Sequence, residues 1–128
     1  MRNILIALGA GVVTCLFVYV TSYGKALDAL GLLLGVMAAI YIGFAIVDGR
    51  SKVVYLESSV AAALIILALL GMWGKPVWLV IGYFVHGAWS LLHQSGVVGT
   101  KVRKWYPVSS MAYSWLVGAY LVYWLGWI

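Results

Sequence analysis

Five apolar stretches fill almost the whole of this 128-residue chain, and their continuity limits the folds open to it. Hydrophobic residues make up 66% of the sequence, charged residues 9%, and the mean hydropathy is +1.08. Such a composition is typical of a chain that folds in lipid rather than in water. Because a bilayer core needs roughly 20 apolar residues per helix, we expect membrane-spanning helices near residues 3–21, 29–47, 58–74, 77–94 and 108–127.

The apolar stretches lack the alternation of polar and apolar residues that marks barrel strands. In lipid, only helices and closed barrels satisfy every backbone hydrogen-bonding group. The sequence therefore predicts an all-α fold, a single polytopic helix bundle over residues 1–128 with about five transmembrane helices. Lys75 and Pro76 leave room only for a tight turn, so the third and fourth helices should form an antiparallel hairpin.

The charges between the apolar stretches predict the orientation of the bundle. With an odd number of helices, only Lys25 and Lys75 lie on one side of the membrane. Because Lys and Arg residues are more frequent on the cytoplasmic side, we expect the N-terminus of this multi-pass inner-membrane protein to lie in the cytoplasm. The other side carries Arg2, Arg50, Lys52, Lys101, Arg103 and Lys104. The net charge of +5 does not point to nucleic acid, because these residues lie in short loops where orientation alone explains them.

The longest predicted loop, residues 95–107, combines glycines, aromatic residues and the cations Lys101, Arg103 and Lys104. This composition suits anionic lipid headgroups, and each cation could add about 1 kcal/mol of attraction. Membrane lipids are therefore the predicted partners. The same cations could equally serve only to orient the chain.

Small residues recur at every fourth position of the second apolar stretch, at Gly31, Gly35, Ala39 and Gly43. Such a ridge lets another helix approach closely. The first stretch has a shorter matching row, Ala7, Gly11 and Cys15, so the simplest expectation is that these two neighbours pack together. A homo-oligomer formed through the same ridge is the alternative.

Polar residues of the fourth apolar stretch share one helical face, and we call this set the polar column: His86, Trp89, Ser90 and His93. Seven residues of helix separate the two histidines by about 10.5 Å, so they cannot bind one metal ion together. Side chains expected to face the polar column are Asp48, Glu57, Ser109, Ser110, Tyr113 and Ser114. Ionisable groups at membrane depth are costly and are often functional.

We expect different roles for the carboxylates of Glu57 and Asp48. Glu57 could cap the third helix, because a helix N-terminus favours negative charge. Asp48 ends a helix and needs a partner such as Arg50, a histidine or a cation. Together with His93, they could hold a divalent metal, while His86 could carry a proton or be a satisfied interior histidine.

Residues 82–94, with Trp105, Tyr106 and Pro107 after them, resemble a group of small bacterial membrane proteins of unknown function. The pattern of that group is roughly His-x-x-Trp-Asp-x-x-His-His. His86, Trp89 and His93 occupy its positions, and looser similarity extends to Asp48-Gly49-Arg50 and Glu57. Ser90 and Gln94 stand where the group has Asp and a second His. The resemblance implies a polytopic fold and no known reaction.

Three classes of function follow. The first is a protein whose polar residues, His86, Trp89, Ser90, His93, Asp48, Glu57 and Tyr113, bind a small ligand, an ion or a lipid on the cytoplasmic side. The second is a membrane-embedded metal-dependent enzyme acting on a lipid or another amphipathic substrate. The third is an interaction protein that docks a partner helix on the glycine ridge. The sequence carries none of the familiar catalytic signatures, so the first class is the one we expect.

Overall fold

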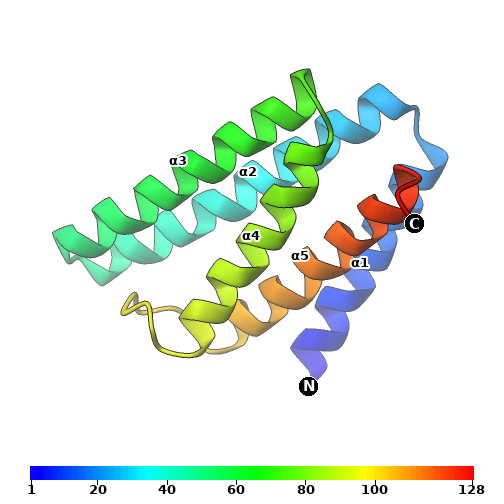
Figure 1. Cartoon of the computed structure of the whole chain (residues 1–128). Coiled ribbons are helices and arrows are strands. Elements are labelled where there is room, and N and C mark those ends of the chain that lie inside the picture. The colour runs from blue at the N-terminus through cyan, green and yellow to red at the C-terminus, as the bar shows by residue number, and fades with distance from the viewer.

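The chain folds into five helices, described over all of residues 1–128 by a computed structural model. Successive helices run in alternating directions (Figure 1). The helices are α1 (Arg2–Val20), α2 (Tyr23–Asp48), α3 (Ser51–Trp73), α4 (Val77–Gln94) and α5 (Trp105–Trp124). The prediction of an all-α fold is confirmed.

The start of α3 differs from the prediction, and this changes the setting of Glu57. Gly49 ends α2 with a positive φ of 84°, which glycine adopts without strain, and its N–H bonds the carbonyl of Ala45. Arg50 is extended, and α3 begins directly at Ser51 instead of near residue 58. Glu57 therefore lies well inside the helix and does not cap it. Its carboxylate needs partners from other elements.

The helices form an antiparallel pair, α2 and α3, and a parallel pair, α1 and α5, with one helix between the pairs. The long helices α2 and α3 pack along each other, α1 packs on α5, and α4 crosses between the two pairs (Figure 1). Only slight contact joins α1 and α2, so the expected packing of these neighbours is not found. Most of α1 does not contact α2, and a pocket that is described below lies between these two helices and α5.

The small residues serve other contacts than the predicted one. A Cβ at Gly11 would lie 2.6 Å from the side chain of Leu116, so the small row of α1 faces α5. A side chain at Gly31 would overlap Met72, which places that end of the ridge against α3. Nothing lies within 4 Å of a Cβ at Gly43, so the other end of the ridge is open. A homo-oligomer through this ridge stays a prediction.

The short link between α3 and α4 forms the expected hairpin. A Cβ at Gly71 would lie 2.8 Å from the backbone nitrogen of Leu79, a contact that real side chains do not make. Glycine at this position therefore lets the two helix backbones approach closely. Pro76 precedes the first residue of α4, where its missing N–H costs no helical hydrogen bond.

The bundle interior is divided into an apolar half and a polar half. The apolar half lies at the end of the bundle where the C-terminus is found (Figure 1) and consists of Val18, Ala26, Leu27, Leu30, Leu34, Ala68, Leu79, Val80, Tyr83, Val117 and Leu121. The polar half lies at the other end, and its buried polar residues are Glu57, His86, Ser90, His93, Thr100, Ser109, Ser110 and Ser114. All the polar interior is therefore concentrated near one end of the bundle.

Three of the helices, α1, α2 and α3, are long and apolar enough to cross a membrane. Their outer faces carry exposed large apolar side chains, including Leu5, Leu32 and Ile66. The polar residues of the interior belong mostly to the two other helices, α4 and α5. These features support a membrane protein.

Candidate functional site

The polar half of the bundle is organised around the carboxylate of Glu57, which has no exposed surface. His93 Nε2 lies 2.5 Å from Oε1, and the Thr100 hydroxyl donates to the same oxygen over 2.6 Å. The Trp89 indole N–H donates to Oε2 over 3.0 Å. Because a buried carboxylate is costly without compensating hydrogen bonds, these three partners are what allow Glu57 to be buried.

The hydrogen bonds of His93 define where its protons are. Nδ1 lies 2.8 Å from the carbonyl oxygen of Trp89, and because a carbonyl only accepts, Nδ1 carries a hydrogen. One further proton then joins Nε2 and Glu57. The pair has no net charge, whether the proton lies on the imidazole or on the carboxyl group. The donors Thr100 and Trp89 stabilise charge on the Glu57 carboxylate.

Tyr41 of α2 connects this pair to a chain of hydroxyl groups. Its ring stacks on the His93 ring with centroids 4.2 Å apart and planes inclined by 26°. Its hydroxyl donates to Ser90 over 2.8 Å, and Ser90 donates to Ser110 over 3.2 Å. The chain of hydroxyl groups therefore runs from α2 through α4 to α5.

His86 forms a second, separate level of the polar column. Its Nδ1 lies 2.8 Å from the hydroxyl of Ser114, and its ring has no exposed surface. Its Nε2 has no hydrogen-bond partner. His86 thus meets a serine of α5, while His93, two turns along the same helix, meets Glu57 of α3.

Asp48 is not part of this cluster. Both of its oxygens bind Arg50, over 2.6 and 2.8 Å, and one also accepts the backbone N–H of Lys101 over 2.9 Å. Arg50 in turn donates to the carbonyl of Gly99 over 2.6 Å. Asp48 and Arg50 therefore tie the turn between α2 and α3 to the loop of residues 95–104, which presents Thr100 to Glu57.

This placement corrects the predicted metal set of His93, Glu57 and Asp48. No group of three His, Cys, Asp or Glu side chains is positioned to hold a metal ion. Asp48 does not join His93 and Glu57 because its charge is already paired with that of Arg50. Both ring nitrogens of His93 are also engaged, one with a carbonyl oxygen and one with Glu57.

The loop cations predicted to meet lipid headgroups, Lys101, Arg103 and Lys104, are exposed. The only salt bridges in the protein are Arg50–Asp48 and His93–Glu57, so these three cations have no carboxylate partner. Lys101 and Lys104 line an open pocket of about 610 Å³ that extends inward to His93. The basic loop is therefore free to interact with anions.

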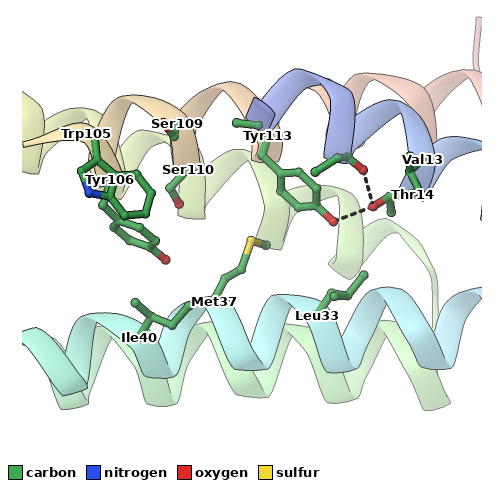
Figure 2. Close-up of a pocket in the computed structure, with 12 residues that line it drawn as sticks. Val13, Thr14, Leu33, Met37, Ile40, Trp105, Tyr106, Ser109, Ser110 and Tyr113 are labelled. Carbon is green, nitrogen blue, oxygen red and sulfur yellow. Dashed lines mark hydrogen bonds between the residues drawn. The ribbon is translucent and has the colours of Figure 1, made fainter. Parts of the chain in front are cut away.

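A second pocket, which we call the side pocket, lies between α1, α2 and α5 and has a volume of about 560 Å³ (Figure 2). Nine of its twelve lining residues are hydrophobic. The lining consists of Ala7, Ala10, Val13, Thr14, Leu33, Met37, Ile40, Trp105, Tyr106, Ser109, Ser110 and Tyr113. The Oγ atom of Ser109 is buried and has no hydrogen-bond partner.

The predicted site residues thus fall into four places. Glu57, His93 and Trp89 come together, and Ser90 joins them through Tyr41. His86 lies beside Ser114, and Asp48 belongs to the loop contact. Tyr113 faces α1, where its hydroxyl lies 2.8 Å from that of Thr14, and it lines the side pocket.

Sequence reasoning missed three contributors, Tyr41, Thr100 and Thr14. Tyr41 has a usable signal, because it carries a hydroxyl in the middle of an apolar helix. Thr14 has the same signal, a hydroxyl inside an apolar stretch, whereas Thr100 lies in a loop and nothing in its local sequence distinguishes it. Their roles arise only from contacts with Glu57 and Tyr113 across the bundle.

Comparison of the chain with protein-family models, with curated protein sequences and with solved structures gave no significant match. The resemblance around His86, Trp89 and His93 stays a prediction.

Replacing His93 with alanine should strongly destabilise the protein, because the Glu57 carboxylate would remain buried without its closest partner. Loss of one member of a buried charge pair typically costs about 3–5 kcal/mol. Thermal unfolding followed by circular dichroism in detergent would measure the loss. Adding Glu57→Gln to His93→Ala should recover part of it, because the amide carries no charge. Unfolding of the single variant at the wild-type temperature would contradict the role given to this pair.

Replacing Asp48 with asparagine should loosen the loop of residues 95–104, because the ion pair that holds Gly99 and Lys101 is weakened. Trypsin should then cleave after Lys101, Arg103 or Lys104 faster than in the wild type, as mass spectrometry of the fragments would show. The matched control is Asp28→Asn, because Asp28 is exposed and has no side-chain hydrogen bond. Equal cleavage rates in the two variants would count against the contact.

Proposed function

We propose that this protein binds one amphipathic, lipid-like molecule in the side pocket, within a multi-pass bundle of the cell inner membrane. The observation that carries the proposal is a mostly apolar pocket of about 560 Å³ whose lining includes the hydroxyl-bearing residues Ser110 and Tyr113. Ligand sites are usually apolar cavities of roughly 300–1,000 Å³ with a few polar groups that fix orientation. The side pocket has this character.

The lining suits a molecule with an apolar body and a polar end. Leu33, Met37 and Ile40 of α2 form one wall, and Val13 of α1 lies opposite (Figure 2). The aromatic and hydroxyl side chains gather on α5, beginning at its first residue, Trp105 (Figure 2). Because α1 and α2 touch only slightly, a ligand could enter sideways between them from the lipid.

The charge distribution agrees with such a ligand. The basic loop immediately precedes α5, and Lys101, Arg103 and Lys104 lack carboxylate partners. An anionic headgroup at the membrane surface would gain about 1 kcal/mol from each nearby cation. The loop and the side pocket adjoin the same first turns of α5, where Lys104 lines the loop pocket and Trp105 lines the side pocket.

The alternatives have less support. A metal-dependent enzyme would need Asp48 near His93 and Glu57, but Asp48 is engaged by Arg50 and Lys101. A docking role for the glycine ridge would have only part of the ridge available, because Gly31 is covered by Met72 while Gly43 is open. Binding of a lipid-like ligand requires no rearrangement of these contacts.

We further propose that all five helices cross the membrane with the N-terminus in the cytoplasm. The polar faces of α4 and α5 are turned inward, which favours burial of these helices in lipid. The excess of cations at the end that holds Arg50 and Lys101 supports the orientation.

Cysteine labelling would test this orientation, using Lys101→Cys and Lys25→Cys, each in a Cys15→Ala background. A membrane-impermeant maleimide should label position 25 in intact spheroplasts, and position 101 only after the membrane is opened. Labelling of position 101 in intact spheroplasts would contradict the proposed orientation.

Filling the side pocket should remove the ligand. The variant Ala10→Trp places an indole in the pocket, whereas Ala62→Trp places the same group on an exposed face of α3. Native mass spectrometry of the detergent-washed proteins should show bound phospholipid at least tenfold less often in the first variant than in the second. Equal lipid occupancy in both variants, with both folded by circular dichroism, would refute lipid binding in the side pocket.

A further inference from the structure

The loop pocket is the open pocket of about 610 Å³ that lies among the end of α4, the basic loop and the start of α5. Only two of its ten lining residues are hydrophobic, and none is Asp or Glu. Lys101 and Lys104 line it and have no carboxylate partner. Arg103 lies between them in the sequence but does not line the pocket. The charge of the pocket therefore comes from two of the three loop cations.

Backbone groups add further donors to the loop pocket. The N–H groups of Gly99, Thr100 and Val102, which line it, donate to no other group of the protein. The helix α5 starts at the same pocket, with Lys104 as its N-cap residue and Pro107 in its first turn. This helix start has no acidic residue and no side-chain cap. Because a helix N-terminus carries partial positive charge, it adds to the field of the lysines.

The negative groups near the loop pocket are already paired. The C-terminal carbonyls of α4 would repel an anion, but the N–H groups of Ser95, Gly96 and Val98 bond the carbonyls of its last turn. Both carboxylates at this end of the bundle are engaged in the salt bridges described above. An anion in the loop pocket would therefore meet unpaired donors and no unpaired carboxylate.

We propose that the loop pocket binds a phosphate group. A phosphate presents at least three acceptor oxygens, which suits donors that come from both the loop and the helix start, whereas a carboxylate presents only two. The bonds from Arg50 to Gly99 and from Thr100 to Glu57 hold the loop in place before binding. This inference goes beyond the proposed function, because it needs no ligand in the side pocket. A phospholipid headgroup and soluble phosphate both supply the group, and the experiment separates these sources.

The lipid arm compares dioleoyl phosphatidic acid with dioleoylglycerol, which has the same chains and no phosphate, by native mass spectrometry of the delipidated protein. Two nearby cations correspond to about thirtyfold in affinity, so the wild type should prefer the phosphatidic acid by about this factor. Lys101→Gln and Lys104→Gln should each reduce the preference about fivefold. Arg103→Gln should reduce it by less than about twofold, because salt screens a charge outside the pocket, and Lys52→Gln on α3 should not change it. Equal reductions in the three loop variants would show diffuse attraction and would overturn the inference.

Inorganic phosphate, followed by phosphorus NMR, provides the second arm. If it binds the wild type and not the double variant Lys101→Gln, Lys104→Gln, the inference is supported with soluble phosphate as a source. A preference for phosphatidic acid that depends on the two lysines, without binding of inorganic phosphate, supports the lipid headgroup as the source. If inorganic phosphate does not bind and the wild type binds both lipids equally, the inference is overturned. Loss of both lipids in Ala10→Trp would then still support the side pocket, so the two proposals fail separately.

Discussion

The buried carboxylate of Glu57 is the constraint on which the polar half of this bundle depends. A carboxylate inside a helix bundle requires donors, and they come from two different elements: His93 and Trp89 on α4, and Thr100 in the loop before α5. These bonds hold α3, α4 and the loop together at one end. The contact between Asp48 and Arg50 holds the loop from its other side.

The same constraint reaches the side pocket through Tyr41. Its ring rests on His93, and its hydroxyl begins the chain of hydrogen bonds through Ser90 to Ser110, which lines the pocket. The position of Ser110 therefore depends on the packing around Glu57. The wall of the pocket and the Glu57 cluster are thus joined through shared side chains.

Much of the architecture follows from residues that act locally. The apolar stretches define helices, and Gly49 and Pro76 help to set the two tight turns. The expected start of α3 is wrong because residues 51–57 contain charged and hydroxyl groups that resemble a loop, although they form a helix whose buried face includes Val53 and Glu57. Which helices pack together was not predictable from small residues alone, since Gly11 faces α5 and Gly31 faces α3.

The sequence by itself determined that the chain is an all-helical protein with membrane-spanning character, and that its polar residues gather near one end, because hydrophobicity and helical spacing are properties of neighbouring residues. It also identified Glu57 and His93 as candidates. Only the tertiary structure decided that Asp48 pairs with Arg50, that Thr100 reaches Glu57 and that Ser109 has no partner. Hydrogen bonds between distant segments depend on how whole helices cross, and no local pattern encodes that geometry.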